Sequence, residues 1–413
     1  MTAETPTLPM PNVRATEARM ITSIGAAHFL SHYYFLLLPP VFLAVRAEYN
    51  VNYTELAFAI TIFNLVSAIF QTPAGLLADR IGPFAVLIAG LALESVAFAL
   101  CGVVHSYWFM VAMFAVAGLA NTVFHPCDYA LLSHHIGKDR VGRAFSIHTF
   151  SGMFGSAAAP VGMVFLASVM GWRGAFIFAG IAGLVVTLVL LVQRRDYAEG
   201  PHIAARAKAN EGEKTNHWAL LMSGPILRSF AFFTLLAATA VGVQNYSVVA
   251  LHELFGTTAD VANSALTGNL LLSSIGVLVG GLFINRIRHH NVAAAVGIGV
   301  AGLAVLAIAL TGPGTAMLLV IMCIGGFASG FVMPSRDMLV REVTPPGAFG
   351  TVFGFVTTGF NVAGVAFPVI FGALMDHGSP RLVLIGSAIC SVAAVLTVIG
   401  GGKRPADPVA AKS

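Results

Sequence analysis

The sequence predicts an all-α polytopic membrane protein with twelve transmembrane helices, arranged as two six-helix bundles related by a pseudo-twofold axis. Three observations predict this fold: the composition, the number of long apolar segments and an internal repeat. Of the 413 residues, 57% are hydrophobic and only 10% are charged, and the mean hydropathy is +0.85. Soluble domains carry about a quarter charged residues, so the composition excludes an ordinary soluble domain.

Apolar segments of about 20 residues are long enough to cross roughly 30 Å of hydrocarbon as helices. Twelve such segments account for most of the chain and leave little for a soluble catalytic domain. The predicted spans are residues 20–44, 55–77, 84–104, 107–132, 144–170, 174–193, 226–250, 262–284, 292–311, 315–340, 349–375 and 380–400.

One long polar stretch separates six spans from six. We therefore predict an N-terminal bundle in residues 1–193, a cytoplasmic linker in 194–225 and a C-terminal bundle in 226–413. With both termini cytoplasmic, 18 of the 22 Lys and Arg residues lie on the cytoplasmic side and 3 on the outside. This bias follows the positive-inside rule and predicts that orientation in the inner (plasma) membrane.

The two halves are also related in sequence, without a gap over about 60 residues, at an offset of 208. Two bundles related in this way place a solute site between them near the bilayer midplane, as in alternating-access transporters. The matched pairs are Gly118 with Gly326, Gly142 with Gly350, Phe145 with Phe353, Pro160 with Pro368, and Arg173 with Arg381.

Residues 75–83 read Gly-Leu-Leu-Ala-Asp-Arg-Ile-Gly-Pro and resemble the loop 2–3 signature of the major facilitator superfamily. The Gly- and Pro-rich fifth span and the Gly-Trp-Arg run at 171–173 support the resemblance, which covers nearly the whole chain. Within the superfamily, His28 to Arg80 and the Phe-His-Pro run at 124–126 resemble the fosmidomycin-resistance branch. Members of that branch export small anionic compounds, so the resemblance implies export of such a solute.

Ionisable side chains inside membrane helices cost about 2.5–3.5 kcal/mol each on insertion scales, so each requires a reason. Asp128 in the fourth span and Arg336 in the tenth occupy equivalent positions of the repeat. We expect them on facing walls of one cavity, with Arg336 binding an anionic group of the solute. Asp128 would bind a proton or pair with Arg336 in the empty site. The alternative is a permanent structural pair.

Histidines form a second candidate group. His28 and His32 are four residues apart on one helix face and, with His125 and His148, could line the N-terminal side of the cavity. They would bind solute or protons, or serve only as hydrogen-bonded groups between helices. Together with Asp128, they also leave a transition-metal substrate open as an alternative.

Amides in the spans are further candidates for solute binding, or for hydrogen bonds that hold helices together. They are Asn64, Gln244, Asn245, Asn269 and Asn361.

Other charged residues receive different assignments. The resemblance gives Asp79 and Arg80 a gating role, with the carboxylate facing the N-terminus of the eleventh span. Asp337 is expected to pair with Arg341 on the helix surface, and Glu94 to be structural.

The function is predicted from the motifs that the sequence lacks and from its internal repeat. The chain contains neither a P-loop nor a Gly-x-Ser-x-Gly elbow, and no zinc-protease motif, so ATP-driven transport and an enzyme are disfavoured. The sequence predicts a proton-coupled secondary transporter of a small anionic or zwitterionic organic solute, with export favoured over uptake. We expect it to act as a monomer in the lipid bilayer, without a cofactor and without nucleic acid. A membrane solute sensor that does not transport is the remaining alternative.

Overall fold

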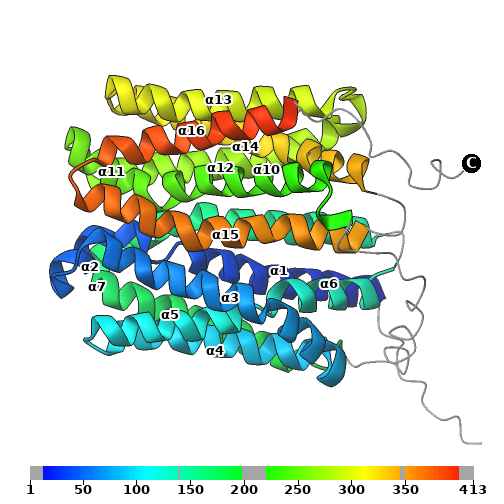
Figure 1. The fold of residues 1–413 in the computed structure, drawn as a ribbon. Helices are drawn as coiled ribbons and strands as arrows, with labels where there is room; N and C mark the ends of the chain where they lie inside the picture. Colours follow the sequence, from blue (N-terminus) through cyan, green and yellow to red (C-terminus); the bar gives the residue numbers. More distant parts are fainter. Residues whose placement is uncertain (1–12, 138–139, 198–219, 345–348, 400–413) are drawn as a thin grey trace, which may run out of the picture.

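The structure is a computed structural model that describes residues 13–137, 140–197, 220–344 and 349–399. The described part is built from helices joined by short turns (Figure 1). In the N-terminal half these are α1 (Val13–Phe35), η1 (Pro39–Val41), α2 (Phe42–Tyr49), α3 (Tyr53–Ile81), α4 (Pro83–Val103), α5 (Tyr107–Asn121), α6 (Phe124–His135) and α7 (Val141–Val192).

The C-terminal half repeats the plan after residue 220. Its elements are α10 (Gly224–Val241), the π-helical segment η3 (Gly242–Tyr246), α11 (Ser247–Phe255), α12 (Ala259–Phe283), η4 (Ile284–Arg286), α13 (His290–Thr311), α14 (Thr315–Val343), α15 (Phe349–Asp376) and α16 (Pro380–Ile399).

The predicted fifth and sixth spans lie in one helix, α7. Its apolar part, Ala144–Val192, has 49 residues, more than twice what one crossing needs. Gly171 interrupts it with φ 71° and ψ 164°, a backbone conformation that glycine adopts without steric cost. The chain can therefore cross the bilayer, turn at Gly171 and cross again, which agrees with two predicted spans.

Three spans predicted as continuous are broken. The first ends at Phe35, and Pro39 and Pro40 follow in η1. The fourth is divided between α5 and α6, where Pro126 has no N–H for the carbonyl four residues earlier. The seventh contains the π-helical segment. Hydropathy predicts these three crossings but not the breaks inside them. The residues at the breaks lower the hydropathy of each segment too little for a break to be detected.

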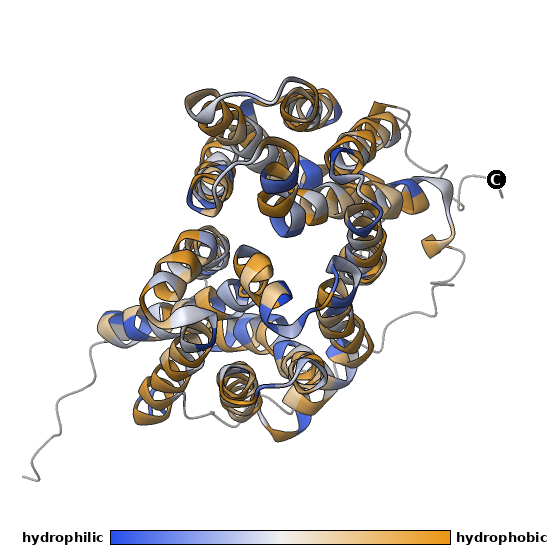
Figure 2. Cartoon of the chain, turned by 90° about the vertical axis from the view of Figure 1, so that its left-hand side faces the viewer, coloured by the Kyte–Doolittle hydropathy of each residue, from blue (hydrophilic) through white to orange (hydrophobic). Residues whose placement is uncertain are grey.

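The helices form two groups that lie side by side (Figures 1 and 2). Within each half neighbouring spans pack on one another, for example α4 on α7 and α12 on α14. Across the halves, α3 packs along α15 and α7 along α12. This arrangement confirms the predicted fold of two helical bundles. The domain boundaries remain predictions, since most of the linker 194–225 lies outside the described residues.

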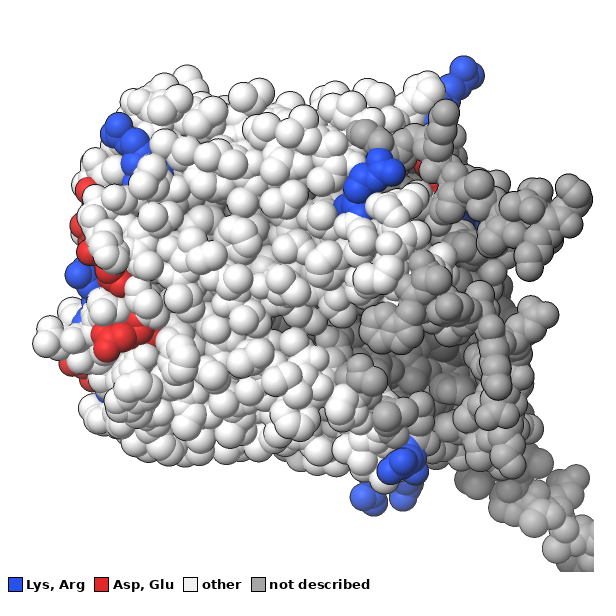
Figure 3. Space-filling model, in the orientation of Figure 1, with Lys and Arg blue, Asp and Glu red and all other residues white. Residues whose placement is uncertain are grey.

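The outer surface suits a bilayer. Large apolar side chains such as Leu282 (81% exposed) and Val192 (76% exposed) point away from the protein, as expected for residues that contact lipid. Figure 3 shows a broad uncharged band between charged ends. Most acidic side chains on this face lie at the left-hand end, opposite the end at which α1 begins and α16 ends (Figures 1 and 3).

Candidate functional site

A cavity of about 440 Å³ lies between the two halves. The N-terminal half lines it with α1, α3 and α7, and the C-terminal half with α10, η3, α12, α13, α14, α15 and α16. This volume is in the range of small-molecule sites. Five predicted site residues line the cavity: His32, Asn64, Gln244, Asn245 and Arg336.

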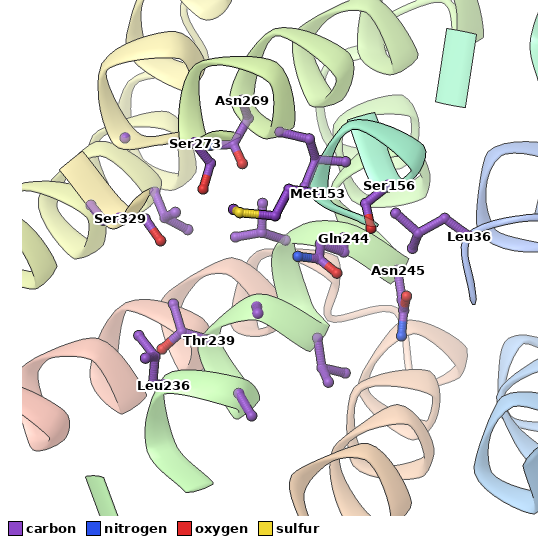
Figure 4. Close-up of a pocket in the computed structure, with 18 of the residues that line it drawn as sticks. Leu36, Met153, Ser156, Leu236, Thr239, Gln244, Asn245, Asn269, Ser273 and Ser329 are labelled. Atoms are coloured by element: carbon purple, nitrogen blue, oxygen red, sulfur yellow. The ribbon is translucent and has the colours of Figure 1, made fainter. Parts of the chain in front are cut away.

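Gln244 and Asn245 reach the cavity from the π-helical segment (Figure 4). A π-turn inserts a residue into the helix and redirects the side chains beside it, and such turns are frequent at functional sites. Gly242 begins the segment where α16 approaches closely, since a Cβ there would lie 1.8 Å from Ser387 Oγ. The break in the helix therefore presents two adjacent amides to the cavity.

Arg336 supplies the positive charge of the cavity wall. Its side chain is 14% exposed, and its guanidinium carbon lies 4.7 Å from the ring centre of Phe233 and 5.5 Å from that of Phe360. Its Nε and Nη2 atoms each lie 2.9 Å from Asp337 Oδ1. The aromatic rings stabilise the cation and hold its plane, while Asp337 occupies two of its hydrogen-bonding groups.

The partner of Arg336 differs from the sequence-based expectation. Asp337 binds Arg336 and not Arg341, and Asp128 has its own partners in the N-terminal half. The predicted Asp128–Arg336 pair is therefore absent from this structure. A helix-face argument identifies which side chains point inward, but it does not fix their distance across two bundles.

Asp128 lies in a buried cluster of histidines next to the cavity. Its Oδ2 atom lies 2.9 Å from His148 Nε2 and 3.2 Å from His28 Nδ1. The two imidazoles are stacked with ring centres 3.6 Å apart, and the ring of His125 lies 5.2 Å from that of His28. The Asp128 side chain is fully buried, and its Oδ1 atom has no hydrogen-bond partner.

His32 connects this cluster with the cavity. It lines the cavity, and its ring centre lies 4.7 Å from that of His28, one helical turn away on α1. His32 Nδ1 lies 3.3 Å from the hydroxyl of Ser156 on α7, which also lines the cavity. The structure thus places the four predicted histidines and Asp128 in one connected group.

The sequence matches the family described as Major Facilitator Superfamily over residues 24–249 and again over 230–412. These matches cover nearly the whole chain, one over each half. The chain belongs to the Major Facilitator Superfamily. It is a multi-pass membrane protein and a secondary transporter that works by alternating access, not an enzyme.

Relatives support this assignment. The chain is 23% identical to the fosmidomycin resistance protein of Escherichia coli K12 over 404 residues, 95% of both chains, which confirms the predicted resemblance. It is 27% identical to the probable sulfoacetate transporter SauU of Cupriavidus necator over 86% of each chain. A segment of 159 residues is 28% identical to the probable L-galactonate transporter of E. coli K12 and covers 38% of this chain and 35% of that protein.

A solved structure supports the fold. A bacterial homologue of the human lysosomal transporter Spinster, in an inward-facing and unoccupied conformation, matches this chain with a TM-score of 0.73. The match covers 96% of both chains at 13% sequence identity.

Three groups of the buried cluster could also bind a transition metal. The ligand atoms of His28, Asp128 and His148 lie within 4.8 Å of one another. A zinc ion would need each of these atoms at about 2.0–2.2 Å. In this structure His148 Nε2 and Asp128 Oδ2 share a hydrogen bond, so a metal would have to displace its proton.

Other predicted site residues do not line the cavity, or their side chains lie outside the described residues. Asn361 is half-buried on α15 and is not among the residues that line the cavity. Arg80 is exposed, and the side chain of Asp79 lies outside the described residues, so the gating assignment remains a prediction. Glu94 is fully buried and accepts a hydrogen bond of 3.0 Å from Asn121 Nδ2, which fits a structural role.

Polar residues that were not predicted as site residues also line the cavity, beside Asn269, which was one of the candidate amides. Asn269 and Ser273 of α12 and Ser329 of α14 lie around one side of the cavity (Figure 4). Asn269 donates to the Met322 carbonyl at 2.9 Å, which leaves its own carbonyl oxygen as an acceptor. The sequence signal was the spacing of Asn269 and Ser273, four residues apart on one helix face.

Proposed function

We propose that this transporter exports a small anionic or zwitterionic organic solute and is coupled to protons. One observation carries the proposal. A buried carboxylate, Asp128, hydrogen-bonds to His148 and lies against His28, next to a cavity whose wall in the C-terminal half carries Arg336. The cavity therefore offers a fixed positive charge for the solute, and the adjacent cluster offers a group that can exchange a proton.

Arg336 supports binding of an acid. A guanidinium stays charged at all physiological pH values and binds carboxylate, sulfonate or phosphonate groups with two parallel hydrogen bonds. The amides of Gln244, Asn245 and Asn269 surround the remaining space and can bind polar groups of the solute. Two relatives are named for organic anions, sulfoacetate and L-galactonate, which agrees with such a solute.

Asp128 supports proton coupling. A carboxylate in the membrane interior is costly unless it is paired. Asp128 Oδ2 shares a hydrogen bond with His148 and lies 3.2 Å from His28 Nδ1, while its Oδ1 atom has no hydrogen-bond partner. Addition of a proton would change the charge that holds α1, α6 and α7 together. A transporter with two conformations can be driven by such a local change if each conformation binds the proton differently.

Direction, membrane and assembly are part of the proposal. The resemblance to the fosmidomycin resistance protein favours export. The distribution of Lys and Arg favours the plasma membrane orientation in which both termini are cytoplasmic. A monomer would suffice, because the cavity is formed by helices of one chain.

A thermal-shift panel on detergent-purified protein tests the solute class. Organic acids, amino acids, organic cations, neutral solutes and divalent metals are compared, with Arg336→Ala and the exposed Arg341→Ala on the same helix as a matched control. A ligand at a hundredfold above its dissociation constant adds about 2.7 kcal/mol of apparent stability. We expect stabilisation by acids or amino acids in the wild type and the control but not in Arg336→Ala.

Other outcomes contradict the proposal. Stabilisation by transition metals alone would favour a metal transporter that uses the histidine cluster. Equal loss for neutral and acidic ligands in Arg336→Ala would indicate structural damage. A ligand that stabilises the protein but is not moved into proteoliposomes would favour a sensor.

Proton coupling is tested with the stabilising acid in proteoliposomes. Asp128→Asn should abolish the pH dependence of transport while the thermal shift with the acid persists. An unchanged pH profile in this variant would remove the coupling role from Asp128.

A further inference from the structure

Asp128 has no direct access to water in this structure. Its side chain is fully buried, and those of His28 and His148 are 3% and 2% exposed. A proton that reaches Asp128 from the cavity must therefore pass through a neighbouring side chain or wait for the helices to separate. The inference below rests on the proposed role of Asp128 as the proton site.

Asp128 lies on α6, which packs on α1, α3, α4 and α7. The described titratable groups close to Asp128 come from α1, α6 and α7. They are His28 and His32 on α1, His125 and Tyr129 on α6, and His148 on α7. The Arg336–Asp337 pair belongs to the other half of the molecule. Within this described set, His32 is the histidine that also lines the cavity.

The two imidazoles of α1 are arranged in series. His28 Nδ1 lies 3.2 Å from Asp128 Oδ2 but makes no hydrogen bond in this structure, while its Nε2 lies on the opposite edge of the ring, next to Gly152. A Cβ at position 152 would lie 2.8 Å from His28 Nε2 and 2.8 Å from His32 Cδ2. The absence of a side chain at Gly152 thus lets both rings occupy the same small space between α1 and α7.

We propose that His32 is the entry point for the proton and passes it through His28 to Asp128. A ring nitrogen of His32 takes a proton from water in the cavity. His32 gives a proton to His28. His28 Nδ1 lies 3.2 Å from Asp128 Oδ2 without a hydrogen bond, so a rotation of the His28 ring aligns its N–H with the carboxylate, and the proton passes to Asp128. Both imidazoles return to their neutral form, and the carboxylate has become a carboxylic acid. A solute bound in the cavity covers His32, so occupancy would control proton entry.

Time-resolved infrared spectroscopy on the purified protein tests this route without a known solute. A proton is released by a light flash from a caged acid, and the carbonyl stretch of a protonated carboxylic acid is followed. The band that is missing in Asp128→Asn reports Asp128. We expect this band in His32→Ala and in His32→Gln at its wild-type final amplitude, but with a rise slowed by about a hundredfold, as for loss of a positioned acid–base group.

Two comparisons separate proton transfer from structural damage. His290→Asn removes a half-buried histidine of α13, outside the cluster, and its rate should remain that of the wild type. Imidazole added to the buffer should restore a fast rise in His32→Ala, because it can enter the space left by the ring.

Three results would overturn the inference. A wild-type rate in both His32 variants would show another route, and a slow rate that imidazole does not restore would show a structural effect. The absence of any Asp128-dependent band in the wild type would instead refute Asp128 as the proton site, which is the proposed function itself.

Discussion

Asp376 at the end of α15 accepts hydrogen bonds from the backbone N–H groups of Tyr53 and Thr54 at the start of α3, both at 2.8 Å. The contact joins the two halves at one end of the molecule. A carboxylate is well placed there, because the first N–H groups of a helix have no partner within it and its N-terminus is partly positive. Glu253 of α11 adds a second link by accepting a hydrogen bond of 3.0 Å from the Tyr53 hydroxyl.

This contact has a predicted counterpart at the other end. There the resemblance places Asp79, at the end of α3, opposite the start of α15. The two acids lie at the ends of the same pair of helices, which pack along each other. The α3–α15 pair would therefore carry one acid-to-helix contact at each end, with one formed when the other is open.

Asp376→Asn should favour the conformation in which the end that holds Asp376 is open. A carboxylate at an exposed helix N-terminus contributes about 0.3–1 kcal/mol, so the equilibrium should shift several-fold. The measurement is the labelling rate of Gln244→Cys, a cavity position, by a membrane-impermeant maleimide applied to that side, in a protein without native cysteines.

Asp260→Asn is the matched control, because Asp260 is an exposed acid in the first turn of α12. Its labelling rate should equal that of the parent protein. Equal rates in the Asp376 variant and the parent would show that this contact does not hold the halves together.

Much of the fold could be predicted from the sequence. The number of spans follows from the length of the apolar segments. The offset of 208 pairs Gly118 with Gly326, and both glycines allow two helices to approach closely. A Cβ would lie 2.3 Å from the Phe63 carbonyl oxygen at the first position and 1.9 Å from that of Asn269 at the second. The two glycines that the repeat pairs thus make equivalent close contacts between helices.

The site could be predicted only in part. His32, Asn64, Gln244, Asn245 and Arg336 all line the cavity. Helix periodicity indicated His32, Asn64 and Arg336, whereas the family resemblance favoured Gln244 and Asn245. Periodicity could not show that Arg336 turns back to its neighbour Asp337, because a long flexible side chain can reach partners that its position on the helix does not suggest. It also could not separate the buried histidine cluster from the cavity, since this depends on the packing of α1 against α7.

Asp337→Asn should strengthen the binding of organic anions. Asp337 now occupies the Nε and Nη2 groups of Arg336, and a bound acid would have to displace it. Because the Asp337 side chain is 46% exposed, the gain is discounted to about 1 kcal/mol, or several-fold in the dissociation constant. Isothermal titration with the acid that stabilises the wild type provides the measurement.

Glu342→Gln removes a nearby exposed acid of the same helix and should leave the affinity unchanged. Weaker anion binding in Asp337→Asn would mean that Asp337 positions Arg336 for the solute and does not compete with it.

Alanine at Gly118 or Gly326 should destabilise the protein in both halves alike. The added methyl group meets backbone of α3 or α12, which cannot move without separating the helices. Overpacking of this kind costs about 1–3 kcal/mol, and thermal unfolding in detergent should show a lower midpoint for each variant. Gly299→Ala is the control, since nothing lies within 4 Å of its Cβ position, and alanine there removes only the flexibility of glycine. If Gly299→Ala loses as much stability as the Gly118 and Gly326 variants, the effect comes from the helix backbone and not from the contact between helices.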